Sequence, residues 1–286
     1  MDETLKSVID HLDLEQLEVN LFRGQSRDAG TRNVFGGQVI GQALVAAERT
    51  VEGRAPHSLH AYFLLPGDVA APIVYQVERI RDGRSFSARR VQAIQHGRPI
   101  FSMIASFHLG EPGLDHFAPM PHVPLPESSG DPNGLGERSP SRSEAGGSGV
   151  RRSGAIEFRR ASLEDRAADR EPRQAYWFRS ADRVPDDPRL HRWLLAYASD
   201  WALSGTALRP HGKTWHDQGM IVASLDHALW FHRSARIDEW LLYSMDSPSA
   251  QGARGLSRGS IHDRSGRLVA SVAQEALMRD VTLSKG

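Results

Sequence analysis

The segment MIVASLDHALWFHR, residues Met220 to Arg233, decides how the rest of the chain can be interpreted. It is rich in strand-forming residues and places a serine, an aspartate and two histidines among large apolar side chains. In a regular strand alternate residues face opposite sides, so Ser224 and Asp226 would share one face. His227 would lie on the other face with Leu229. We therefore expect a single strand here that borders a polar site.

Two further segments carry isolated polar residues in apolar surroundings. Upstream, HRWLLAYASDWALSGTAL (191–208) is typical of a buried helix and contains one acid, Asp200. Downstream, LVASVAQEALM (268–278) is typical of a strand whose one face is apolar except for Gln274. A buried amide must find hydrogen-bond partners or cost about 1–3 kcal/mol. We predict that the three segments meet, so that Asp200, Ser224 and Gln274 form one site.

Each of these residues also has a purely structural interpretation. Asp200 could be a helix cap, and Gln274 could satisfy a neighbouring backbone group. Ser224 alone would be an ordinary strand serine. Its interest depends on the other two residues.

Other chemistry in this region has weaker support. A lone histidine on an apolar face, such as His227, is more often a hydrogen-bonded core residue than a base. His227 and His232 fall on opposite faces of a regular strand, which argues against a metal site. The residues Gly255 to Gly259 match the nucleophile-elbow pattern G-x-S-x-G. An elbow needs a helix after it, whereas this sequence continues as a hairpin, so we do not expect a serine nucleophile.

Composition limits the possible partners. The chain has 286 residues, with 35 Lys and Arg balanced by 35 Asp and Glu, so its formal net charge is zero. Neither nucleic acid nor an anionic membrane is favoured as the main partner. The chain contains 0 cysteines, which excludes disulfides, thiolate metal sites and a thiol nucleophile.

Neither end of the sequence carries a recognised address. The first twenty residues are acidic and amphipathic, unlike a secretory signal, and no stretch has the apolar length of a membrane span. The final Ser284-Lys285-Gly286 is close to the peroxisomal Ser-Lys-Leu address but lacks the leucine. A cytoplasmic location is therefore the expectation.

Hydrophobic periodicity predicts the elements of the first half. We expect helices at residues 1–20 and 34–51, strands at 21–26, 58–65 and 73–83, and a hairpin at 85–109 that turns at His96-Gly97. The second helix begins at Gly36-Gly37 and is apolar on nearly every side, so it should be enclosed by other structure. Its glycine-rich start could offer free backbone N–H groups to an anion or an oxyanion.

The middle of the chain changes character. Residues 111–127 are rich in proline, and residues 128–155 have almost no large apolar side chain. We expect an N-terminal domain at 1–120, a flexible linker at 121–160 and a C-terminal domain at 161–286. Structure should resume near Ile156, with a strand at residues 175–180.

The second half of the sequence repeats the first. The 25 residues from Gly83 align without a gap on those from Gly252, and the turn residues Gly97-Arg98 fall on Gly266-Arg267. In this alignment Gln274 lies opposite Ala105, and a separate helix alignment puts Asp200 opposite Gly41. The repeat predicts two copies of a helix wrapped by an antiparallel sheet, whose edges could pair into one continuous sheet. The polar residues occur only in the second copy.

The segments VFGGQVIGQAL, HSLHAYFLLPGD, SDWALSGTAL, ASLDHALWFHR, EWLLYSMDSPSAQGARGLSRG and LVASVAQEALMR resemble the signature segments of the acyl-CoA thioesterase II family. The resemblance covers both halves and implies an α+β double hotdog fold. It places the family's water-activating aspartate, hydroxyl residue and glutamine on Asp200, Ser224 and Gln274. Some members have threonine where this chain has Ser224.

The resemblance also implies a reaction. Water would attack the thioester carbonyl of a fatty acyl-CoA directly, with no metal and no organic cofactor, and coenzyme A would leave as the thiol. It implies a homo-oligomer as well. Two alternatives stay open, a catalytically silent acyl-CoA-binding protein and an acyl-thioester hydratase or dehydratase. The latter would need a histidine paired with an acid, and neither predicted helix core contains a histidine.

Overall fold

The computed structural model describes residues 1–27, 33–127, 152–161, 163 and 171–283. The helices are α1 (Glu3–Leu12), α2 (Gly36–Glu48), α3 (Pro188–Ser199) and α4 (Leu203–Thr206), with a short 3-10 turn, η1, at Arg209–His211. The first-half strands are β1 (Glu15–Glu18), β2 (Leu21–Gly24), β3 (Ala55–Phe63), β4 (Ile73–Asp82), β5 (Phe86–Gln95) and β6 (Arg98–His108). The later strands are β7 (Arg152–Ser153), β8 (Ile156–Ala161), β9 (Arg173–Ser180), β10 (Met220–Ser224), β11 (Asp226–Phe231), β12 (Leu241–Gln251), β13 (Arg254–Asp263) and β14 (Leu268–Asp280).

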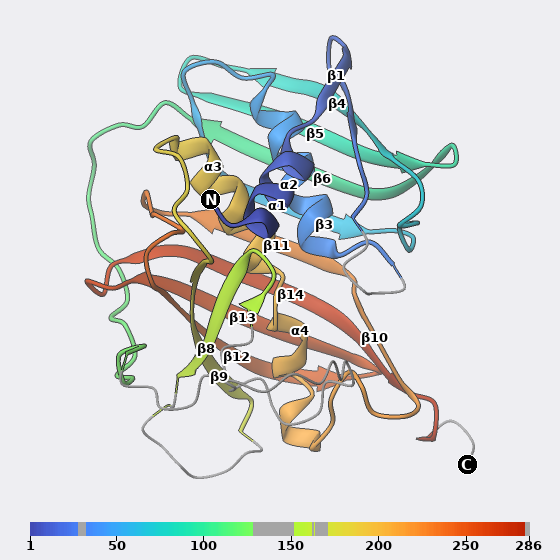
Figure 1. Cartoon of the computed structure of the whole chain (residues 1–286), viewed down its shortest axis with the longest axis vertical. Helices are drawn as coiled ribbons and strands as arrows, with labels where there is room; N and C mark the ends of the chain where they lie inside the picture. The colour runs from blue at the N-terminus through green and yellow to red at the C-terminus, as the bar shows by residue number, and fades with distance from the viewer. Residues whose placement is uncertain (28–32, 128–151, 162, 164–170, 284–286) are drawn as a thin grey trace.

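The described strands form one antiparallel sheet built from two similar halves (Figure 1). The order β2-β4-β5-β6-β3 in the first half is followed by β11-β14-β13-β12-β9, which is the same arrangement reversed. The halves join where β3 pairs with β11, from Asp226 opposite Tyr62 to Trp230 opposite Ser58. This pairing leaves no free edge at the junction. The predicted α+β double hotdog fold is confirmed.

Helices α2 and α4 pack against this sheet. Every residue of α2 from Gly37 to Glu48 is buried, as its all-round apolar pattern predicted. It packs against β4, β5 and β6 and also against α3. In the second half α4 packs against β12, β13 and β14 in the corresponding way. Each half therefore wraps its sheet around a helix.

The two hairpin turns share a glycine at the aligned position of the internal repeat. β5 and β6 turn at His96 and Gly97, which both have positive φ, 50° and 72°, as a two-residue hairpin turn requires. The aligned Gly266, between β13 and β14, also has a positive φ of 87°. Glycine adopts this conformation without a steric penalty.

The first predicted helix is too long. α1 ends at Leu12, and residues 15–18 form β1 instead. Leu5, Val8 and Leu12 are buried at helical spacing, but Leu17 is 42% exposed. Asn20 takes a positive φ of 63° in the turn that brings β1 against β2. Pairing with β2 therefore overrides the helical pattern after Leu12.

The predicted helix 191–208 is interrupted. α3 ends at Ser199, and α4 begins only at Leu203. Between them Ala202 has a left-handed backbone with φ of 61°. The interruption is supported by Gln174, whose Nε2 donates to the Ala202 carbonyl over 2.9 Å. In the aligned helix α2, where Gly41 lies opposite Asp200, the helix continues unbroken to Glu48.

The expected linker at 121–160 also needs correction at both ends. Residues 156–160 belong to strand β8, which shortens the linker and confirms that structure resumes near Ile156. Residues 128–151 lie outside the described residues. At the other end, the Pro124 carbonyl accepts a hydrogen bond from Trp177 Nε1 over 2.8 Å. Glu127 forms an ion pair with Arg264. The proline-rich segment therefore lies along the second half. Its sequence has no periodicity, so these contacts could not be predicted from it.

Candidate active site

Asp200 lies at the point where the two halves of the chain meet. It follows the last residue of α3, and its side chain is buried. The backbone N–H of Gly37, at the start of α2 in the other half, interacts with this carboxylate and lowers its pKa. A carboxylate is favoured at a helix N-terminus because of the free N–H groups there. The glycine-rich start of α2 therefore lies against an anion, and this anion is a side chain of the protein.

Ser224 is the last residue of β10, and an irregularity in the strand follows it. Ser224 pairs with Ala276 of β14, whereas Ala228 of β11 pairs with Ala273. Four steps along one strand therefore correspond to three along the other, which is a β-bulge. Asp226 supports the bulge by accepting a hydrogen bond from the Glu275 N–H over 2.7 Å. The predicted single strand is therefore two strands that differ in which residues face inward.

Gln274 lies on the inward face of β14, as predicted, and is 1% exposed. Its Nε2 donates to Ser224 Oγ over 2.9 Å. Ser224 Oγ lies 3.4 Å from Asp200 Oδ1. The amide of Gln274 also favours the charged form of the Asp200 carboxylate, since it lowers the pKa of that group. The three predicted residues are therefore brought together from α3, β10 and β14.

His227 belongs to the same cluster. The prediction that it lies on the strand face opposite to Ser224 is wrong. Its Nδ1 lies 2.6 Å from Gln274 Oε1, and its Nε2 lies 2.9 Å from Ser199 Oγ. The error comes from the bulge, because an extra residue exchanges the faces of all residues beyond it. The interpretation of His227 as a hydrogen-bonded buried histidine agrees with its contacts. The polar pair Asp226-His227, which interrupts a run of strand formers, was the available signal.

Burial controls the charges in this cluster. It raises the pKa of Asp200, and His227, Gln274, Gly37 and Ser224 partly offset this effect because they favour the carboxylate. Burial likewise lowers the pKa of His227, against the attraction of Asp200. A carboxylate with a raised pKa is suited to accept a proton near neutral pH.

A cavity of about 420 Å³ opens onto Asp200 and Ser224. Its walls are mostly apolar and come from both halves: Val34, Phe35, Val39, Phe63, Leu64, Leu65, Ile100 and Phe101 from the first, and Trp215, Val222, Ala223 and Leu225 from the second. An apolar cavity that ends at a few convergent polar groups is typical of a small-molecule site.

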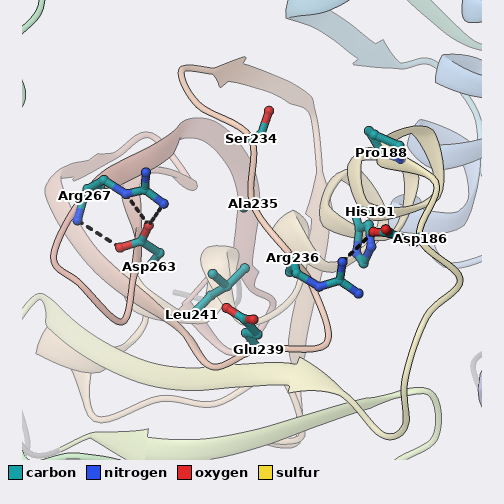
Figure 2. A pocket seen from close by; sticks show the side chains of 10 residues that line it. All are labelled: Asp186, Pro188, His191, Ser234, Ala235, Arg236, Glu239, Leu241, Asp263 and Arg267. Carbon is teal, nitrogen blue, oxygen red and sulfur yellow. Dashed lines mark hydrogen bonds and ion pairs between the residues drawn. The ribbon is translucent and has the colours of Figure 1, made fainter.

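A second cavity, of about 300 Å³, contains none of the predicted residues (Figure 2). Its arginines are already paired with carboxylates of the protein. Arg236 binds Asp186 and Asp238, and Arg267 binds Asp263. Because these pairs neutralise one another, the cavity offers little charge to an anionic ligand.

The remaining sequence hypotheses can also be placed. Ser257 lies inside strand β13, buried and opposite Gln274, with no helix after it, so the nucleophile elbow is excluded. His232 bonds Ser271 on the exposed side, away from the buried His227. Within the described residues, no group of three or more His, Asp or Glu side chains could hold a metal ion. No helix in that part of the chain is long and apolar enough to cross a membrane.

The fold and the site together are those of a hotdog thioesterase. A family profile described as acyl-CoA thioesterase matches residues 158–277, and one described as acyl-CoA thioesterase N-terminal domain matches residues 25–108. The chain is 41% identical to acyl-CoA thioesterase 2 of Haemophilus influenzae, over 98% of this chain and 99% of that protein. It is also 41% identical to human acyl-coenzyme A thioesterase 8, over 94% of this chain and 87% of that protein.

A solved structure supports the same assignment. The crystal structure of an acyl-CoA thioesterase II from Mycobacterium marinum matches with a TM-score of 0.80 and 43% identity, over 96% of this chain and 97% of that one. The chain therefore belongs to the acyl-CoA thioesterase family, whose enzymes are thioester hydrolases. This confirms the resemblance drawn from the sequence and favours hydrolysis over the silent binding protein and the hydratase.

Proposed function

We propose that the chain hydrolyses fatty acyl-CoA by direct attack of water that Asp200, Ser224 and Gln274 activate. The supporting observation is their convergence from three elements: Asp200 and Ser224 line an apolar cavity, and the buried Gln274 donates to Ser224 from behind it. The acyl chain would lie in that cavity and bring its thioester carbonyl to the three side chains. We also propose that the chain acts in the cytoplasm as a homo-oligomer.

The chemical step needs only these groups. Asp200 takes a proton from water as its oxygen bonds to the carbonyl carbon, and the C–S bond then breaks. The proton passes to the departing thiolate, so the products are a carboxylic acid and coenzyme A thiol. Gln274 and Ser224 orient the water. The oxyanion would be met by backbone N–H groups at the start of α2.

The decisive test is thiol release from a panel of acyl-CoA esters, short to long, by wild type and by Asp200→Asn. We expect wild type to hydrolyse the longer esters and Asp200→Asn to lose most of its activity with an unchanged circular dichroism spectrum. Asp246→Asn is a matched control, because it removes a carboxylate from an exposed ion pair with Arg258. No release of thiol from any ester would refute the proposed reaction, and an active Asp200→Asn would refute the proposed site.

The roles of the other two side chains can be separated. Ser224→Thr keeps the hydroxyl and should remain active, whereas Ser224→Ala and Gln274→Ala should both lower kcat. An Ser224→Ala variant with wild-type kcat would remove the hydroxyl from the mechanism. Light scattering would test the oligomer, since a molecular mass near the 31.6 kDa of one chain would contradict it.

A further inference from the structure

The orientation of the Gln274 amide is the feature that the proposed chemistry leaves unexplained. Oε1 of this buried side chain faces His227 Nδ1 over 2.6 Å, and Nε2 faces Ser224 Oγ over 2.9 Å. The amide has an acceptor on one side and a donor on the other. Rotating it by half a turn would exchange these two contacts, so that Oε1 would face Ser224 Oγ and the NH2 group, which favours the Asp200 carboxylate, would face His227. Some group must therefore hold the amide in its productive orientation.

The proton on His227 can do this. A neutral imidazole carries its proton on one nitrogen only, and burial lowers the pKa of His227, which favours the neutral ring. With the proton on Nδ1, the ring donates to Gln274 Oε1, and the amide NH2 must face Ser224 and Asp200. With the proton on Nε2, two lone pairs would face each other across 2.6 Å. The tautomer of His227 and the orientation of Gln274 are therefore linked.

Ser199 completes the arrangement on the other side of the ring. Its Oγ lies 2.9 Å from His227 Nε2 and 2.8 Å from the Ala196 carbonyl. A serine hydroxyl has one hydrogen, so it can donate to only one of these acceptors. Donation to Nε2 is compatible with the Nδ1 proton. If His227 Nε2 no longer accepts, the hydroxyl can turn to Ala196 without being left unsatisfied.

We propose that His227 is a positioning residue that acts through Gln274. With its proton on Nδ1, it holds the amide so that its NH2 group points at Ser224 and Asp200. Ser224 Oγ then receives a hydrogen bond from Gln274 and directs its own hydrogen at Asp200. The Asp200 carboxylate is left as the acceptor for a proton from water. This proposal rests on the function proposed above.

Two substitutions of similar size test the role of the Nδ1 proton. The amide nitrogen of His227→Asn falls near the position of Nδ1 and can still donate to Gln274. That of His227→Gln falls near Nε2 and can reach only Ser199. We expect His227→Asn to retain kcat within about threefold and His227→Gln to lose about 10- to 100-fold, the effect common for groups that orient a functional side chain. KM and the melting temperature should differ little between the two.

Controls separate this role from simple packing. His262 is another buried histidine, on β13, and its Nε2 bonds the Ala118 carbonyl over 3.3 Å, outside the site. His262→Asn and His262→Gln should have equal kcat. In a double-mutant cycle, His227→Gln should add little to the loss caused by Gln274→Ala, because both changes remove the same ordered amide. Nitrogen-15 NMR of the wild-type histidines should show the Nδ1-protonated tautomer for His227, without any substitution.

The outcomes distinguish the two proposals. Equal losses in His227→Asn and His227→Gln, losses that add to that of Gln274→Ala, or an Nε2-protonated ring would each overturn the positioning role. A fully active Gln274→Ala would overturn the proposed site itself. The NMR result decides the role of His227 even if neither variant folds.

Discussion

Gly36, at the start of α2, lies so close to Asp200 that a Cβ at position 36 would be 2.7 Å from the carboxylate Oδ2. The two residues come from different halves of the chain. Only glycine allows the helix to approach the carboxylate this closely. The first half lacks the polar residues of the site. Its contribution is the backbone at the start of α2, which lies against the Asp200 carboxylate.

Gly36→Ala should consequently impair catalysis more than folding. Its methyl group would press on the Asp200 carboxylate and, at 3.0 Å, on the Phe63 ring. We expect kcat to fall about 10- to 100-fold, as is usual when a reacting group is displaced by a fraction of an ångström. Steady-state kinetics and thermal unfolding would measure the two effects.

Gly41→Ala is the matched control within the same helix. The nearest atom to its methyl group would be the Leu12 side-chain tip, at 2.8 Å, which can move. Alanine also favours a helix over glycine by about 1 kcal/mol. Near-normal kcat is therefore expected for Gly41→Ala. If both variants lost activity equally, the contact between Gly36 and Asp200 would not be the cause.

Asp200→Asn should be more stable than wild type at alkaline pH although it is far less active. Because burial raises the pKa of Asp200, the folded state holds the proton more tightly than the unfolded state. Its contribution to stability is present at low pH and is lost as pH rises through the raised folded-state pKa. Asparagine has no such titration. The melting temperature of Asp200→Asn should therefore exceed that of wild type at pH 8 and approach it in acid.

Ionisation of Asp200 should raise the catalytic rate as pH rises, whereas it lowers stability. The carboxylate is the form that accepts a proton, so wild-type kcat/KM should increase with pH through the raised pKa of Asp200. Loss of the general base should reduce the rate of Asp200→Asn by about 10²–10⁴-fold. A wild-type profile that declines over this range would contradict a role for Asp200 as base.

Much of the site followed from the sequence because the relevant patterns are local. Gln274 was conspicuous as the one polar residue on an apolar strand face, and the face is set by a period of two that holds along β14. The internal repeat predicted two copies of a helix wrapped by a sheet, joined into one continuous sheet, and the apolar periphery of α2 predicted its enclosure.

The predictions that were wrong concern features that depend on contacts between residues distant in the sequence. The break after Asp200 is supported by Gln174 on β9, and the bulge after Ser224 is defined by pairing with β14. Neither partner can be read from the segment itself. The bulge puts His227 on the face opposite to the one predicted. For this reason the sequence did not reveal that His227 contacts Gln274. A single inserted residue is enough to defeat a periodicity argument.

Stability should decline in mild acid because several histidines are held neutral. Burial lowers the pKa of His57, His191, His227, His232 and His262. For each, the unfolded state binds a proton more readily than the folded state, so stability is present above about pH 6.5 and is lost as pH falls through the lowered values. Asp200, with its raised pKa, adds stability as pH falls, but it is one group against five histidines. The urea midpoint should therefore fall between pH 7.5 and pH 5.

His191 is suited to test this effect outside the site. It is buried, and its Nε2 has no hydrogen-bond partner among the described residues. Since the ring must gain a proton on unfolding in acid, His191→Asn should show a shallower pH dependence of the urea midpoint. An unchanged slope would assign the acid sensitivity to other groups.

Glu48 should matter for stability and not for the reaction. This buried carboxylate, at the end of α2, accepts hydrogen bonds from Arg192 over 2.5 Å and from Trp193 Nε1 over 2.6 Å. It therefore joins α2 to α3 about 18 Å along the helix from Gly36, at 1.5 Å per residue. Removing it would leave a buried indole N–H and a partly buried guanidinium without their acceptor.

Glu48→Ala should therefore lower the free energy of unfolding by about 2–3 kcal/mol, in the range found when a buried polar pair loses one partner. Glu48→Gln keeps an acceptor for Trp193 and should lose less. The exposed Glu52 just beyond the helix supplies the control, since Glu52→Ala should be neutral. Urea denaturation would measure the free energies, and kcat should stay at the wild-type value in the folded variants. A large drop in kcat for folded Glu48→Ala would mean that the α2–α3 contact transmits its effect to Asp200.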